Sequence, residues 1–349
     1  MSIISKVYDI LKDIEDPVTK EKLVNLGLIR DVSVENGVLS LKLIASTEKE
    51  LENFEKEIRE RLKTIEEIKD IVIQKEMKKI EPPKLKREPK RGAGKRKVEG
   101  VKHVIAVASG KGGVGKSTVA ANLALALESL GYKVGLFDGD IYGPSIAKMF
   151  GIEGLAPRVE NEKMIPIERF GIKILSMGLL LDEQTPVIWR GPLVHKAYEQ
   201  FFFDANWQGL DFLIVDFPPG TGDAQISASQ LVDMSGGIAV TTPQDVSLAD
   251  VRRAINMFIK MGIKILGVVE NMSFFICPNC GHKTYIFGEG GAKKLELEMG
   301  VPVIGEIPVD PDVSTSGDLG MPVLLSRPDS PATQAFKNIA EEIIKKLEA

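Results

Sequence analysis

Ten residues, from Ser109 to Thr118, have the types and the spacing that bind phosphate. Residues 110–117 match the pattern G-x-x-x-x-G-K-[ST] at every fixed position. Glycine lets the backbone approach an anion closely, and a helix that begins here points its N–H groups at the phosphates. A glycine-rich turn without a ligand would not require the lysine and the serine as well. The stretch predicts a nucleotide site made of Gly110, Lys111, Gly112, Gly113, Val114, Gly115, Lys116, Ser117 and Thr118.

Carboxylates follow two apolar runs that read as buried strands. Asp138 and Asp140 come directly after one run, and Asp216 ends another. A carboxylate at such a strand end beside a phosphate loop can orient the water shell of Mg²⁺ while Ser117 ligates the ion. We therefore predict Asp216 and Ser117 as magnesium residues. The alternative for Asp138 and Asp140 is that they only cap the turn that follows them.

Both cysteines of the chain, Cys277 and Cys280, lie in one Cys-Pro-x-Cys-Gly segment. A turn of this kind aims two thiolates at one point, as a metal site requires. A closed tetrahedral site or a four-iron cluster takes four protein ligands, and one chain has two thiols. His282 is too close in sequence to complete the set comfortably, so the simplest closure is a second copy that donates its own pair. A redox-active dithiol is the alternative.

Strand-like and helix-like runs alternate through residues 101–349 and must position these side chains. The strand-like runs are apolar without alternation, which favours an α/β fold with a mostly parallel sheet and helices on both faces. Ligands of such folds bind at the carboxyl ends of the strands. The predicted strands are Val104–Ala108, Lys133–Phe137, Ile172–Ser176, Phe212–Val215, Gly237–Thr241, Ile265–Val269 and Val303–Ile307. Val119–Leu127 and Ala332–Leu347 are predicted helices, the second one packed on the core.

Residues 1–80 predict a small α+β domain. Two runs that alternate around Gly37 predict a hairpin. The predicted elements are helices at Ile3–Leu11, Val18–Leu26 and Glu48–Leu62, and strands at Leu28–Val34, Val38–Ile44 and Ile68–Ile73.

Residues 81–100 predict a flexible basic linker between this domain and the domain at 101–349. Positions 75–97 hold eleven basic residues against three acidic ones, and prolines and glycines interrupt any regular element. A nucleic-acid patch is the alternative, but no aromatic side chain is interleaved to stack on bases.

Composition argues against a disulfide-rich, membrane-spanning or nucleic-acid-binding protein. The 349 residues carry a net charge of −4, and the cysteine count leaves no disulfide framework. No apolar run reaches the length of a membrane span, and the start does not have the layout of a signal peptide. We expect a cytoplasmic protein that acts on neither nucleic acid nor membrane.

The position of Lys111, directly after Gly110, resembles the deviant phosphate loop of the MinD, ParA, nitrogenase iron protein and Mrp/ApbC class. The resemblance implies that Lys111 reaches the nucleotide of a partner subunit, so that two copies form a homodimer. It also implies that Asp140 positions the attacking water and that Asn271, after the run Ile265–Val269, contacts the nucleobase. The octet Asp216–Asp223 closely matches the Mrp/ApbC pattern.

Together with Cys277 and Cys280, these segments resemble an Mrp/ApbC iron–sulfur carrier ATPase. The resemblance implies slow ATP hydrolysis with Mg²⁺, in which Lys111, Lys116, Asp140 and Asp216 are catalytic. It further implies a [4Fe–4S] cluster held between two subunits and passed to apo-proteins, with cluster assembly proteins as further partners. The alternatives are a MinD/ParA-like partition or positioning ATPase and a dimeric targeting ATPase with a structural interfacial zinc.

The first domain resembles the metal–sulfur assembly domain that often precedes such ATPases. The segments that carry this likeness are Val7–Leu11, Asp16-Pro17 and Leu26–Ile29. Where that family has a cysteine segment, this chain has Ser46-Thr47-Glu48-Lys49. The domain is therefore interpreted as a docking or assembly module that supplies no thiolate.

Overall fold

The computed structural model consists of two compact units, one formed by described residues up to 77 and one by described residues from 95 onward. Each unit is described by itself. The residues that the structure describes are 3–11, 13–14, 23, 29–35, 37–45, 48–65, 67–77, 95–141, 143–180 and 191–348.

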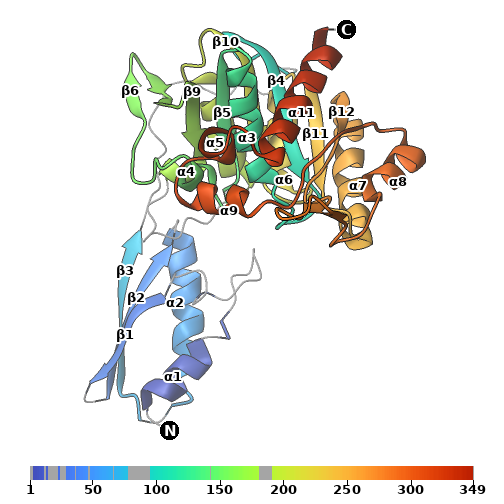
Figure 1. Cartoon of the computed structure of the whole chain (residues 1–349). Helices are drawn as coiled ribbons and strands as arrows, with labels where there is room; N and C mark the ends of the chain where they lie inside the picture. The colour runs from blue at the N-terminus through green and yellow to red at the C-terminus, as the bar shows by residue number, and fades with distance from the viewer. Residues whose placement is uncertain are drawn as a thin grey trace. The chain divides into compact units, whose positions relative to one another are not determined.

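The small unit packs two helices on one three-stranded sheet (Figure 1). Strand β1 is antiparallel to β2 and β3 is parallel to it, so β2 lies in the centre. Alternate residues of β2 (Leu39, Leu41 and Leu43) are buried against both helices. The elements are α1 (Ile3–Leu11), β1 (Ile29–Glu35), β2 (Val38–Ala45), α2 (Glu48–Leu62) and β3 (Asp70–Met77). They confirm the predicted hairpin, helices and last strand, whereas the helix predicted at Val18–Leu26 lies almost wholly outside the described residues.

The large unit is built on one sheet with the strand order β15-β12-β11-β4-β10-β5-β9-β8. Every neighbouring pair is parallel except β8 with β9. The strands are β4 (Val101–Ser109), β5 (Val134–Asp138), β8 (Ile167–Arg169), β9 (Ile172–Ser176), β10 (Leu210–Asp216), β11 (Gly236–Thr241), β12 (Ile265–Glu270) and β15 (Val303–Glu306). All seven predicted strands are confirmed. The short edge strand β8 is an addition, and its charged residues gave no apolar signal.

Helices cover both faces of this sheet, because successive residues of its buried strands point to opposite sides. On β4, Ile105 and Val107 belong to one core and Val104 and Ala106 to the other. The first face holds α3 (Lys116–Ser129), α4 (Ile146–Met149), α9 (Pro311–Asp318), α10 (Val323–Ser326) and α11 (Pro331–Glu348). The second holds α5 (Gly191–Phe203), α6 (Asp223–Leu231), α7 (Asp245–Lys260) and α8 (Gly291–Met299). The predicted α/β class is confirmed, and so is the core packing of the last helix.

Short elements complete the unit. They are β6 (Arg158–Glu160), β7 (Lys163–Ile165), the 3-10 turn η1 (Met177–Leu180), β13 (Phe275–Ile276) and β14 (Lys283–Thr284). None of the described helices combines the length and the apolar character that a bilayer span needs.

The described part of the large unit begins at residue 95, before the expected boundary at 101. The Arg96 N–H donates to the Leu231 carbonyl at 2.9 Å, and the Arg96 guanidinium lies 3.7 Å from the centre of the Phe203 ring. Val98 is buried. The last residues of the predicted linker therefore pack on the folded unit, and the basic linker stays a prediction for 81–94, which lie outside the described residues.

Candidate functional site

The phosphate loop joins the end of β4 to the start of α3. Gly113 and Gly115 both have φ of +81°, a left-handed conformation that favours glycine. A Cβ on Gly110 would lie 2.0 Å from a backbone atom of Asp250, whereas a Cβ on Gly112 would meet no heavy atom within 4 Å. The loop is thus packed tightly at its beginning and open in its middle. That open side fits a bound anion.

Lys116 brings together three of the four predicted catalytic residues, itself, Asp140 and Asp216, whereas no contact joins the Lys111 side chain to them among the described residues. Its Nζ donates to Asp216 Oδ1 at 2.6 Å and to Ser117 Oγ at 3.0 Å, and lies 3.8 Å from Asp140 Oδ2. Lys116, Asp140 and Asp216 are all buried. They meet because β4, β10 and β5 are adjacent parallel strands whose carboxyl ends lie at one edge of the sheet.

Asp216 carries an oxygen that has no partner within the described part of the chain. Its Oδ1 bonds Lys116, whereas Oδ2 is buried and makes no hydrogen bond. Burial raises the pKa of Asp216, and the charge and hydrogen bond of Lys116, together with a hydrogen bond from Ser117, oppose that rise. Buried polar atoms are nearly always paired, so this oxygen fits a ligand such as the water shell of Mg²⁺. The Ser117 hydroxyl beside it is the second hard oxygen donor that magnesium prefers.

Asp138 holds the turn that presents Asp140. Its carboxylate accepts hydrogen bonds from the Asp140 N–H at 3.1 Å, the Ile146 N–H at 3.2 Å and the Ser176 hydroxyl at 2.8 Å. Burial and the nearby charge of Asp216 raise the pKa of Asp138 to about 7. Asp138 therefore caps the turn that follows it, which is the alternative that the sequence analysis left open for this residue. The sequence did not predict its contact with Ser176 on β9.

Gln225 is a positioning residue that the sequence did not reveal. Its Nε2 donates to the carbonyls of Pro218 at 2.7 Å and Gly220 at 3.1 Å, and the side chain is buried. The Gly220 N–H in turn donates to the Ser109 carbonyl at 2.9 Å. The Pro-Pro-Gly turn is thereby tied to both α6 and the phosphate loop. A lone glutamine in a helix carries no sequence signal for such a role.

Asn271 contacts the phosphate loop from the end of β12, whereas Lys111 is part of the loop itself. Asn271 donates from Nδ2 to the Val114 carbonyl at 2.9 Å, and its backbone N–H donates to the Thr241 carbonyl at 2.8 Å. Its side chain is buried against the loop, so contact with a nucleobase stays a prediction. Lys111 is half-buried, and its carbonyl accepts a hydrogen bond from the Ser109 hydroxyl at 2.9 Å.

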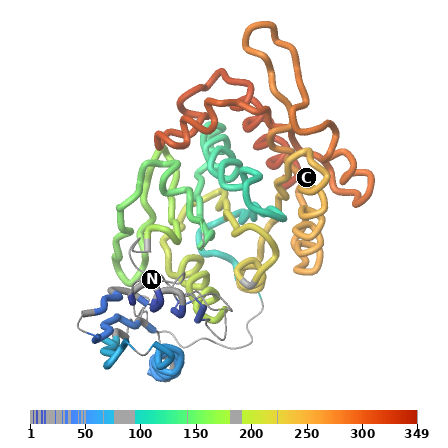
Figure 2. Tube along the Cα trace, turned by 90° about the horizontal axis from the view of Figure 1, so that it is seen from below, coloured from blue at the N-terminus to red at the C-terminus, as the bar shows by residue number. Residues whose placement is uncertain are grey.

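The two cysteines sit in the turn of the hairpin formed by β13 and β14, which projects from the body of the unit as an orange loop in Figure 2. The Cys277 N–H donates to the His282 carbonyl at 3.0 Å, and the Gly281 N–H to the Cys277 carbonyl at 2.8 Å. Hydrogen bonds from the Cys280 and Asn279 N–H groups lower the pKa of Cys277. Cys280 is exposed. Within the described residues, no third histidine, cysteine or carboxylate gathers with them into a metal site.

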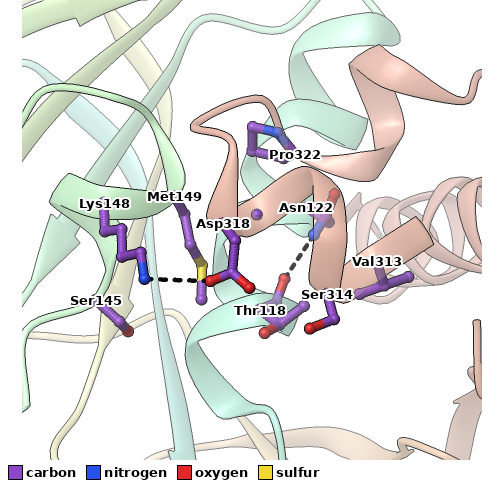
Figure 3. Close-up of a pocket in the computed structure, with 10 residues that line it drawn as sticks. Thr118, Asn122, Ser145, Lys148, Met149, Val313, Ser314, Asp318 and Pro322 are labelled. Carbon is purple, nitrogen blue, oxygen red and sulfur yellow. Dashed lines mark hydrogen bonds and ion pairs between the residues drawn. The ribbon is translucent and has the colours of Figure 1, made fainter. Parts of the chain in front are cut away.

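A cavity of about 290 Å³ adjoins the phosphate loop (Figure 3). It lies between α3, α4 and α9. Thr118 and Asn122 line it from α3, and the Asn122 Nδ2 donates to the Thr118 carbonyl at 2.9 Å. Lys148 and Asp318 form an ion pair of 3.3 Å between α4 and α9 on its wall. Its mixed apolar and polar lining and its place beside Thr118 make it a candidate site for the part of a nucleotide that lies beyond the phosphates.

Comparison with known proteins agrees with this geometry. The family model of the NUBPL iron-transfer P-loop NTPase matches residues 100–344. The chain belongs to this family. A second model, of an iron–sulfur cluster assembly protein, matches residues 4–74. The resemblance inferred from the sequence is confirmed for both parts of this P-loop NTPase.

Relatives extend along the whole chain. A protein named iron–sulfur cluster carrier protein from Aquifex aeolicus is 52% identical over 257 residues, which are 73% of this chain and 71% of the relative. A protein of the same name from Synechocystis is 43% identical over an alignment that covers 98% of this chain and 97% of the relative. Among solved structures, a nucleotide-binding protein from Archaeoglobus fulgidus in complex with ADP has a TM-score of 0.59 at 38% identity, covering 69% of this chain and 94% of its own. The cell division ATPase MinD from Pyrococcus furiosus has a TM-score of 0.54 at 26% identity, covering 70% of this chain and 99% of its own.

Proposed function

We propose that this P-loop NTPase binds and hydrolyses ATP and carries a [4Fe–4S] cluster, held between two copies of the chain, to apo-proteins. The observation that carries the proposal is the pairing, in one folded unit, of a complete phosphate-loop site with two thiols on a projecting hairpin. The names of the Aquifex and Synechocystis relatives support the cluster as cargo.

The hydrolytic step follows from the side chains that meet at the loop. Binding of a triphosphate draws Lys116 from Asp216 toward the phosphates, and Asp140 then positions the attacking water. Lys111 of one copy reaches the phosphates bound by the other, which makes the nucleotide part of the dimer interface. Ser117 would ligate Mg²⁺ and Oδ2 of Asp216 would orient the water shell of the ion, and the bound ion would supply charge neutralisation for the phosphate oxygens.

The cluster site is completed by symmetry. One chain supplies Cys277 and Cys280, and a two-fold axis brings the same pair from the second copy, giving the four thiolates that a [4Fe–4S] cluster takes. The lowered pKa of Cys277 favours the thiolate form that binds iron. The small unit contains no cysteine and acts as a docking module for assembly proteins or recipients.

Anaerobic reconstitution with iron and sulfide tests the cargo. A dimer with broad absorbance near about 400 nm, lost in Cys277→Ala, is the expected result. Stoichiometric zinc without a chromophore would instead support the interfacial zinc site, and hydrolysis stimulated by DNA or lipid without a cluster would support a positioning ATPase. Lys116→Ala is the matched variant: it should abolish ATP turnover and still take up the cluster.

A further inference from the structure

One buried carboxylate holds both ends of the segment that carries the two cysteines. Glu270 is the last residue of β12, and its side chain is 1% exposed. Its Oε1 accepts a hydrogen bond of 2.6 Å from the Ser273 hydroxyl, and its Oε2 accepts one of 2.6 Å from the Ala292 N–H. Ser273 precedes the hairpin and Ala292 follows it, so the carboxylate closes the 273–292 loop at its base.

The far end of this loop depends on Glu270 as a helix cap. Helix α8 begins at Gly291, and its N-cap residue, Gly290, has no side chain that could accept a hydrogen bond. The first N–H groups of a helix need acceptors, and a negative charge is favoured beside them. Gly291 itself is pressed against the chain, because a Cβ there would lie 2.5 Å from the Pro243 carbonyl oxygen. The base of the loop is therefore rigidly placed.

The residue next to Glu270 contacts the phosphate loop. Asn271 donates to the Val114 carbonyl at 2.9 Å, and a Cβ on Gly115 would lie 2.2 Å from the same amide nitrogen. A chain of direct contacts therefore runs from Val114 through Asn271 and Glu270 to Ser273 and Ala292. No solvent-filled gap or flexible surface side chain interrupts it, since Asn271, Glu270 and Ser273 are all buried.

We propose that Glu270 is a positioning residue that couples the phosphate loop to the cysteine hairpin. When the loop adjusts to phosphates, the Val114 carbonyl moves and takes Asn271 with it. Glu270 passes this movement to both ends of the 273–292 loop at once, so that Cys277 and Cys280 are reoriented as a pair. This coupling rests on the proposed function, in which it is the route by which a bound nucleotide acts on a bound cluster. Its test needs no cluster.

Thiol accessibility measures the coupling directly. In the reduced, metal-free full-length protein, the rates at which a maleimide alkylates Cys277 and Cys280 are followed by mass spectrometry with and without a non-hydrolysable ATP analogue. For the wild type we expect a change of about fivefold or more on addition of nucleotide. In Glu270→Gln one carboxylate oxygen becomes an NH₂ group, which cannot accept a hydrogen bond, and the negative charge is lost. The change should therefore fall below about twofold while analogue affinity stays within about twofold.

Glu289→Gln is the matched control, because Glu289 is exposed on the same loop and the variant removes the same charge. It should respond to nucleotide as the wild type does. A wild-type response in Glu270→Gln, or no response in the wild type itself, overturns the coupling. Failure to reconstitute a cluster, by contrast, would count against the proposed cargo and leave this result untouched.

A second measurement avoids the risk that a substitution at a buried position prevents folding. Hydrogen exchange of the wild type, read on peptides that contain Ser273 and Ala292, should change in both peptides when the analogue binds. Ser273→Ala removes the hydroxyl that donates to Glu270. In this variant the exchange of the peptide with Ala292 should still change on binding of the analogue, and the exchange of the peptide with residue 273 should not. Unchanged exchange in both wild-type peptides under saturating nucleotide would also overturn the coupling.

Discussion

The ammonium of Lys116 and Oδ1 of Asp216 lie 2.6 Å apart, and this hydrogen bond joins the phosphate loop to the end of the neighbouring strand. The two residues are a hundred positions apart in the sequence. They meet because β4 and β10 are adjacent and parallel, with Asp216 in register with Val107 just before the loop. In the proposed function, nucleotide binding draws Lys116 away from this contact.

Lys116→Ala should abolish turnover and also destabilise the large unit. Loss of the ammonium leaves the Asp216 carboxylate buried without its partner, which costs about 3 kcal/mol or more of unfolding free energy. Denaturant unfolding and phosphate release measure the two effects. Lys345→Ala removes a lysine from an exposed pair with Glu342 and should leave the unfolding free energy nearly unchanged. Equal losses in the two variants would contradict the role of the buried pair.

Two glycines of the loop should respond in opposite ways to alanine. In Gly110→Ala the new Cβ meets the backbone of Asp250, so we expect a loss of stability of at least about 1 kcal/mol. In Gly112→Ala the Cβ enters open space, so thermal stability should hold. ATP affinity should fall about tenfold or more, because the methyl group would enter the open side of the loop that we propose for the phosphates. Calorimetry and nucleotide titration separate the two. Full ATP affinity in Gly112→Ala would place the anion elsewhere.

The titration of Asp138 should make the unfolding free energy depend on pH. Its pKa is raised to about 7, so between about pH 4 and pH 7 the folded protein holds a proton that the unfolded chain has released. This group's contribution to the unfolding free energy therefore falls as the pH rises through that range. Asp138→Asn removes the titration, so the stability of the wild type relative to the variant should fall from pH 4 to pH 7 and then level off.

Chemical unfolding at several pH values, followed by tryptophan fluorescence, measures this difference. Asp233→Asn is the control, because it makes the same change at an exposed aspartate. A constant difference between the wild type and Asp138→Asn across the range would show that Asp138 is ionised in the folded protein.

Gln225→Glu should impair hydrolysis more than binding. The new carboxylate oxygen faces the carbonyls of Pro218, Pro219 and Gly220, which in the wild type accept from the amide, so the Pro-Pro-Gly turn loses its support. We expect kcat to fall about tenfold or more with KM changed much less. Gln230→Glu lies on the exposed side of the same helix and should keep full activity. A rise in KM alone would assign Gln225 to binding.

The sequence alone determined the parts of this protein whose signals are local. The phosphate loop is one contiguous motif between a strand and a helix, and the strands of the large sheet are apolar runs, so both were predicted with nearly correct limits. The Cys277 and Cys280 turn was visible for the same reason. Local patterns suffice there because backbone hydrogen bonding and burial of one face depend on neighbours in the sequence.

Tertiary structure decided which distant groups meet. That Glu270 bonds both Ser273 and Ala292, that Ser176 supports Asp138, and that Gln225 holds the Pro-Pro-Gly turn all follow from the strand order and from where each helix begins. A buried polar side chain must find partners, but its sequence neighbours do not say which backbone atoms will lie within reach. The order β12-β11-β4-β10-β5-β9 brings those atoms together at one edge of the sheet, and only the folded chain specifies that order.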